Sequence, residues 1–106
     1  MEGVDKMTKH IMSVNASMSL YRSTLVPGKL NLYDDIITFE AHGPLAGTEV
    51  KDTFLLDEIK SIKSGISIVP FRIVIMEKNG ESWLFDQVNR QEAKAFVKSF
   101  KAAVGE

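Results

Sequence analysis

The stretch PFRIVIMEKNGESWLFDQVNRQEAKAFVKSF, residues 70–100, decides the fold of this chain of 106 residues. Residues 71–76 and 82–85 are rich in β-branched and aromatic side chains, and Asn79-Gly80 lies between them. Two such runs around Asn-Gly predict a β-hairpin. The residues that follow predict a helix, so the stretch contains strand, turn, strand and helix in that order.

The length of the hairpin loop decides which side chains share a face. A two-residue loop at Asn79-Gly80 would pair Met76 with Trp83, whereas a three-residue loop that includes Lys78 would pair Ile75 with Trp83. We favour the three-residue loop, with Gly80 in the left-handed conformation. It collects these apolar side chains on one face: Phe71, Ile73, Ile75, Trp83 and Phe85.

The helix predicted after the hairpin is amphipathic. Asn89 is a suitable N-cap, Glu92 follows three residues later as in a capping box, and Gly105 marks the end. Apolar residues recur at helical spacing on one side, and lysines lie on the other: Ala93, Phe96, Val97, Phe100 and Val104 against Lys94, Lys98 and Lys101. A hairpin and a helix of this length are each marginal alone in water, so both need more sheet.

Residues 12–20 alternate between apolar and polar side chains, which predicts a half-buried strand. A helix is the alternative, because Met7, Ile11, Val14 and Met18 also fall near one helical face. We favour the strand, since the alternation is unbroken and the serines disfavour a helix.

The middle of the chain predicts further strands. Pro27-Gly28 predicts a turn, residues 29–33 and 36–39 a hairpin around Asp34-Asp35, and residues 42–47 a loop. Strands in succession followed by one terminal helix describe a strongly bent antiparallel sheet, or small barrel, whose open side the helix plugs.

Four more segments complete this reading of the middle of the chain. Residues 50–56 predict a strand and residues 58–62 a short extended piece. Ser64-Gly65 then predicts a turn, and Pro70 the start of the hairpin strand, where its missing donor is tolerated.

Composition limits the class of protein. The chain has 44% hydrophobic and 25% charged residues, which predicts one soluble domain, residues 12–104, after a frayed segment, residues 1–11. A formal net charge of -1 argues against a nucleic-acid partner. The absence of Cys excludes disulfides and thiolate chemistry, and no signal peptide or membrane-spanning run is evident, so we expect a cytoplasmic protein.

Several segments resemble the GRAM domain family. Residues 28–39, GKLNLYDDIITF, resemble its opening, in which a glycine precedes a strand with alternating leucines, a tight turn and a strand ending in Phe. Residues 56–62 are similar to its acidic turn and isoleucine pair, residues 73–85 to its last hairpin, and Arg90, Phe96 and Phe100 to its helix. The resemblance covers about residues 13–103. It implies a mainly β, pleckstrin-homology-like split barrel of about seven antiparallel strands capped by one C-terminal helix.

The resemblance also implies a function. Members of the family bind membrane lipids, especially phosphoinositides, or proteins, and are not enzymes. Carried over to this chain, the basic side chains that would contact a lipid headgroup are Arg22 and Lys29, with Lys51 and Lys78 as neighbours. Asn31, Asp34 and Asp35 stand where a basic residue would help, which weakens this prediction because scattered bases bind an anionic surface weakly.

No other motif points to catalysis or to a cofactor. His10 and His42 are far apart in the sequence, whereas a metal site needs several convergent ligands. Asp34 and Asp35 are adjacent in a predicted turn, where their side chains point apart and where Asp is common. The chain has no phosphate-binding glycine loop and no nucleophile elbow. We therefore predict no metal, no cofactor and no enzymatic activity.

These observations favour a non-enzymatic binding module that acts through protein contacts, either with an unidentified partner protein or by self-association. A strand edge or an apolar loop would supply the contact. Met12, Met18 and Leu45 are the apolar candidates, and ordinary core packing is the alternative for them. Lipid binding at the periphery of a membrane is the second hypothesis, and a small hydrolase-type enzyme is a distant third.

Overall fold

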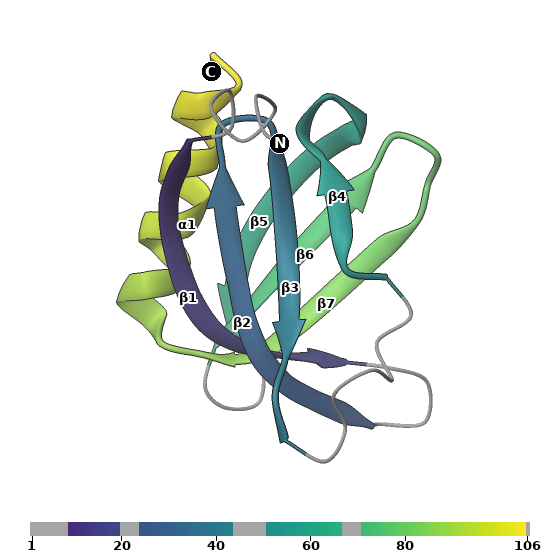
Figure 1. Ribbon diagram of the computed structural model, residues 1–106, viewed down its shortest axis with the longest axis vertical. Coiled ribbons are helices and arrows are strands. Elements are labelled where there is room, and N and C mark those ends of the chain that lie inside the picture. Colours follow the sequence, from purple (N-terminus) through teal and green to yellow (C-terminus); the bar gives the residue numbers. More distant parts are fainter. Residues whose placement is uncertain (1–8, 20–23, 44–50, 67–70, 106) are drawn as a thin grey trace, which may run out of the picture.

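The computed structural model describes residues 9–19, 24–43, 51–66 and 71–105, which form a seven-stranded antiparallel sheet and a C-terminal α-helix (Figure 1). The elements are β1 (His10–Ser19), β2 (Leu25–Tyr33), β3 (Ile36–Ala41), β4 (Thr53–Leu55), a 3₁₀ turn (Leu56–Glu58), β5 (Ile59–Ile66), β6 (Phe71–Glu77), β7 (Ser82–Val88) and α1 (Arg90–Ala103). Among the described residues, no helix is long and apolar enough to cross a membrane.

The first strand joins the two halves of the sheet. The strand order is β4-β3-β2-β1-β7-β6-β5, so β1 pairs with β2 on one side and with β7 on the other. The sheet curls into a barrel that stays open between its two edge strands, β4 and β5, and α1 packs against β1, β5 and β6 (Figure 1). The predicted bent antiparallel sheet plugged by a terminal helix is confirmed.

The hairpin of β6 and β7 has the predicted register. Ile75 pairs with Trp83 and Ile73 with Phe85, and Gly80 has the left-handed conformation with φ 96°. The three-residue loop is therefore confirmed. The apolar face it creates is buried, with Trp83 only half-buried at its edge.

The N-cap of α1 is also as predicted. The side chain of Asn89 accepts hydrogen bonds from the backbone N–H groups of Gln91 and Glu92, at 2.9 and 3.1 Å. Gly105, with φ 84°, follows the last turn. The helix buries Ala93, Phe96 and Phe100 in the core.

Aromatic rings from three parts of the sheet meet at the centre of the barrel. Phe39 and Phe54 contact Phe85, with ring centroids 5.4 and 6.0 Å apart, and Trp83 packs edge-on against Phe54 at 5.9 Å. The alternating side chains of β1 reach the same core through Val14, Ala16 and Met18, which confirms the strand rather than the helix for this segment.

Two predicted turns are wrong. Pro27 and Gly28 lie inside β2, where Gly28 pairs with both Ala16 and Ala41. Ser64 and Gly65 lie inside β5, paired with residues of β6. Glycine is common in turns, but it also occurs inside strands where another backbone approaches closely. A glycine in the sequence therefore does not by itself distinguish a turn from a strand.

Other boundaries also differ from the prediction. The strand expected at residues 50–56 is confined to β4, and the short extended piece at residues 58–62 is part of the longer β5. Strand β1 begins at His10, inside the segment expected to be frayed. Pro70 and residues 44–47 of the predicted loop lie outside the described residues.

Candidate functional site

An open groove of about 690 Å³ lies at one end of the barrel. The end of α1, the turn between β2 and β3 and the 3₁₀ turn after β4 all lie at this end, which is uppermost in Figure 1. The groove is lined by Asp34, Asp35, Ile36, Leu55, Leu56, Asp57, Ile59, Lys60, Lys78, Phe100, Ala103 and Val104.

The groove exposes apolar surface. Leu55 is 44% exposed and Val104 is 37% exposed, and both line it. In the part of the chain that the structure describes, the third large apolar side chain with comparable exposure is Ile11, at 38%, which does not line the groove. Strand β4 and the end of α1, which are distant in sequence, thus bring exposed apolar side chains to one concave surface.

Backbone hydrogen bonds hold the walls of the groove in place. The N–H of Leu56 donates to the carbonyl oxygen of Asp35 at 3.0 Å, which ties the 3₁₀ turn to the turn between β2 and β3. The N–H of Lys78 donates to the carbonyl oxygen of Glu58 at 2.9 Å and ties the opposite side. A site whose walls are already fixed loses little conformational entropy when it is occupied.

The local sequence explains why Leu55 is exposed. In a strand, successive side chains point to opposite faces, so two adjacent apolar residues cannot both face the core. Phe54 of β4 is buried and its neighbour Leu55 points outward. An apolar residue next to Phe54 in a predicted strand is the signal in the sequence that could have located this site, but the sequence does not show that Val104 lies beside it.

Lys51, a predicted headgroup contact, has an internal partner. Its Nζ lies 3.2 Å from Oε2 of Glu77 and 5.4 Å from the centre of the Phe54 ring. Glu77 is only 3% exposed, and its Oε1 accepts a hydrogen bond from the indole N–H of Trp83 at 3.0 Å. Lys51 therefore balances a buried carboxylate, which is costly to leave unpaired.

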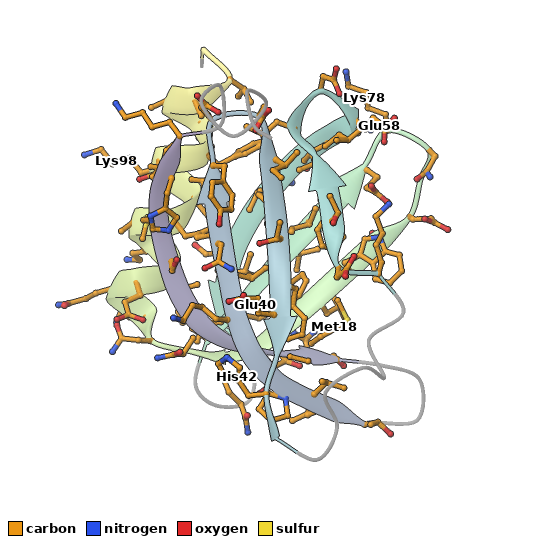
Figure 2. All side chains as sticks on the ribbon, viewed as in Figure 1. Met18, Glu40, His42, Glu58, Lys78 and Lys98 are labelled. Carbon is orange, nitrogen blue, oxygen red and sulfur yellow. The ribbon has the colours of Figure 1, made fainter. Side chains whose placement is uncertain are left out.

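Among the described residues, the predicted bases do not all gather at one site. Lys51 and Lys78 share a small cavity of about 260 Å³, but Asp57, Glu58 and Glu77 line it too, so it is a poor site for an anion. Lys29 lies on β2 opposite Glu40, and Figure 2 shows Glu40 far from Lys78 along the barrel. Arg22 lies outside the described residues.

The predicted apolar contacts fall in different places. Met18 is fully buried in the core, so it cannot contact a partner protein from the surface, and its role as a contact residue is wrong. Met12 is half-buried and packs against the core. Leu45 lies outside the described residues.

Among the residues that the structure describes, the histidines and acidic residues form no cluster of the kind that binds metals. His10 pairs with Tyr33 at one end of β2, whereas the backbone N–H of His42 donates to the carbonyl oxygen of Pro27 near the other end. His10 Nε2 lies 2.8 Å from Oγ of Ser13. Within the described ranges, no group of three or more His, Cys, Asp or Glu could hold a metal ion.

Asn31 has a structural role that the sequence did not indicate. It is buried on β2, and its side-chain oxygen accepts a hydrogen bond from Oγ of Ser13 at 2.6 Å. Its amide nitrogen donates to Oγ1 of Thr38 at 3.1 Å. These bonds link β1, β2 and β3 across one face, so a position at which a base was considered from the sequence carries a polar cross-strand link instead.

The seven antiparallel strands and the C-terminal helix define a pleckstrin-homology-like fold. The chain is similar to the linker-DH/PH domains of p115-RhoGEF, with a TM-score of 0.73 and 10% identity over 93% of this chain and 30% of that one. It is similar to the R399E mutant of the DH/PH domains of p115-RhoGEF, with a TM-score of 0.65, 11% identity and coverage of 93% and 31%.

A third solved structure matches along most of its own length. It is the C-terminal domain of an unknown protein from Leishmania infantum, with a TM-score of 0.68 and 17% identity over 92% of this chain and 88% of that one. This chain thus spans most of that domain, but less than a third of the p115-RhoGEF structures. No protein-family model and no curated protein matches the chain. Identities this low establish the fold alone.

Proposed function

We propose that this domain is a non-enzymatic binding module that holds an apolar side chain of a partner protein in the groove between Leu55 and Val104. The observation that carries the proposal is the convergence of these two exposed side chains on one concave surface. Modules of the pleckstrin-homology-like class commonly act by binding, and the resemblance to GRAM domains supports the same role.

The chemistry of the groove fits an apolar anchor with polar neighbours. Fully burying a large aliphatic side chain contributes about 1.5 to 3 kcal/mol, so an anchor that covers both exposed side chains supplies a useful part of a binding energy. The lining of the groove also includes the acidic residues Asp34, Asp35 and Asp57 and the basic residues Lys60 and Lys78. Rim charges of both signs would orient a partner rather than attract it from a distance.

Lipid-headgroup binding is the alternative and has less support among the described residues. It would rest on Lys29 and on Arg22, because Lys51 is paired with Glu77. On the protein-binding hypothesis the domain works in the cytoplasm, and on the lipid-binding hypothesis it works at a membrane surface.

Photo-crosslinking from single positions tests the proposal. A benzoylphenylalanine is placed at Leu55, at Val104 or at Ile11, which has similar exposure but lies outside the groove. In extracts of the cells that produce the protein, we expect one discrete adduct from Leu55 and Val104 and none from Ile11. The partner is then identified and purified, and we expect Leu55→Asp to weaken its binding about tenfold, whereas Ile11→Asp leaves it unchanged.

Three results would contradict the proposal. The same adducts from all three positions, no adduct from any, or an unchanged affinity in Leu55→Asp would each exclude the groove as the contact. A parallel sedimentation assay uses vesicles with and without phosphoinositide at about 0.15 M salt. Headgroup-specific binding that is lost in Arg22→Ala/Lys29→Ala would favour the lipid hypothesis instead.

A further inference from the structure

Strand β5 has a free edge. It is the last strand in the sheet order and pairs antiparallel with β6 on one side, and no strand among the described residues pairs with its other side. An unpaired edge presents a row of backbone donors and acceptors that an extended peptide can complete. At Gly65, near the end of β5, an added Cβ would meet no atom within 4 Å, so the face of the strand is uncrowded at this position.

Helix α1 forms a wall beside this edge. A groove of about 470 Å³ lies between them, with Ser64 of β5 on one side and residues of the helix on the other. Its apolar part comes from Val97 and Ala102, and its remaining lining is the lysines Lys94, Lys98 and Lys101. The groove therefore combines a strand edge, a small apolar surface and a cationic rim.

The three lysines are exposed and have no acidic partner among the described residues. In the part of the chain that the structure describes, the two ion pairs are Lys51–Glu77 and Arg72–Asp86, and neither involves the helix. Lys98 extends from the helix into solvent in Figure 2. The spacing of four and then three residues places the lysines on one face of the helix. Lys63 of β5 is also exposed and adds to the positive charge of the edge.

Acidic groups around the groove do not cancel this charge. Glu92 lies in the first turn of α1, and Asp57 and Glu58 precede β5, but none of them lines the groove. Lysines beside an edge strand also discourage pairing with a second neutral strand. The same charges favour a strand that carries carboxylates.

We propose that an extended acidic segment of a partner protein adds to the free edge of β5, with alternate carboxylates facing the lysines of α1. Alternate residues of a strand lie about 6.7 Å apart, and the three lysines span about 10 Å along the helix axis, so two carboxylates lie within their reach. This contact uses other residues than the groove at Leu55 and Val104, and either site can fail without the other.

The probe for the experiment is a fluorescein-labelled octapeptide of alternating glutamate and valine, titrated with the full chain and followed by fluorescence anisotropy. Two further peptides isolate the two parts of the recognition. Lysine in place of glutamate reverses the charge, and proline in place of valine keeps the charge but removes backbone donors and disfavours pairing. Of the three peptides, we expect only the glutamate–valine peptide to bind.

Charge reversal on the helix then tests the lysines. We expect Lys98→Glu/Lys101→Glu to raise the Kd of the glutamate–valine peptide about tenfold, and the same variant to bind the lysine–valine peptide instead. Lys9 is exposed, precedes β1 and does not line the groove. Lys9→Glu reverses the charge of this single lysine and should leave the Kd unchanged. Amide resonances of residues 59–66 should shift on titration, which a contact with the helix alone would not produce.

Several outcomes overturn the proposal. They are no binding of the glutamate–valine peptide, equal binding of the proline peptide, a Kd unaffected by the double reversal, and shifts confined to the helix. Vesicles with and without phosphatidylserine provide one more comparison. If the wild type binds the anionic vesicles through Lys98 and Lys101 but does not bind the peptide, the basic face contacts a membrane and the acidic segment is excluded.

Discussion

At the residue scale, Gly28 is required by the backbone that faces it. A Cβ at this position would lie 2.2 Å from the carbonyl oxygen of Glu40 and 2.9 Å from Cα of Ala41. The clash is with backbone atoms, which cannot move aside as the end of a flexible side chain can. Strand β2 therefore approaches β3 closely at Gly28.

We expect Gly28→Ala to lower the free energy of unfolding by about 2 to 3 kcal/mol, because the extra methyl group forces the two strands apart. Gly65→Ala is the matched control, since a Cβ at Gly65 in β5 meets nothing within 4 Å. That substitution should change the free energy by less than about 0.5 kcal/mol. Urea denaturation of both variants measures this difference, and equal losses would show that the close approach is absent.

Arg72 and Asp86 form a second residue-scale feature, a cross-strand ion pair between β6 and β7. Both Nε and Nη2 of Arg72 donate to the carboxylate. The hydrogen bond that Arg72 donates to Asp86 raises the pKa of Arg72, a guanidinium that is already charged at any physiological pH. A group whose pKa is raised on folding contributes its stability below its unfolded pKa and loses it only as the pH rises through the folded value.

The contribution of Arg72 should therefore not vary around neutral pH. We expect Arg72→Lys to cost about 0.5 to 1 kcal/mol, a small value because the side chain is 38% exposed and water screens the pair. Thermal unfolding at pH values from about 7 to 9 should give the same difference between wild type and variant throughout. A difference that changes across this range would mean that another titrating group is coupled to the pair.

At the scale of elements, α1 stabilises the fold by inserting aromatic side chains into the open side of the barrel. We expect Phe100→Ala to lower the free energy of unfolding by about 3 to 5 kcal/mol, because it leaves a cavity under the last turn of the helix. Val104→Ala, at an exposed position one turn later, should cost less than about 1 kcal/mol. Chemical denaturation distinguishes the two, and a near-zero loss for Phe100→Ala would contradict the role of the helix as a plug.

Local sequence rules predicted the elements whose ends are marked by turn or capping residues. The register of β6 and β7 followed from the Asn79-Gly80 turn and the alternating pattern, and the N-cap of α1 followed from Asn89. The same rules wrongly predicted turns at Pro27-Gly28 and Ser64-Gly65. At position 28, the glycine is required by the close approach of the neighbouring strand. This close approach is a tertiary contact, and the residues next to Gly28 in the sequence do not indicate it.

The candidate sites were less predictable than the elements. Leu55 and Val104 belong to segments far apart in the sequence, and only the tertiary fold brings them together. Lys94, Lys98 and Lys101 were visible as one face of a helix, but the free edge beside them depends on which strand ends the sheet. Lys51 is one of the bases expected from the family resemblance, and its pairing with the buried Glu77 has no signal in the sequence.

At the scale of the whole molecule, the two halves of the sheet depend on each other. The core takes Phe39 and Phe54 from the first half and Phe85 from the second, and α1 contacts both halves. We expect a fragment of residues 1–66 to lack a cooperative unfolding transition, since it has neither β7 nor the helix to cover its apolar face. Amide NMR of the fragment is the measurement, and dispersed resonances with a cooperative melt would show that the first half folds alone.

The position of β1 between β2 and β7 has a consequence for how the chain folds during synthesis. Ser17 and its hydrogen-bond partner Gln87 are 70 positions apart. At translation rates of about 5 to 20 residues per second, the first strand waits roughly 4 to 14 seconds for its second neighbour. During that interval one edge of β1 and the apolar side chains along it are open to other chains, so this segment, rather than either candidate site, sets the risk of aggregation for the nascent protein.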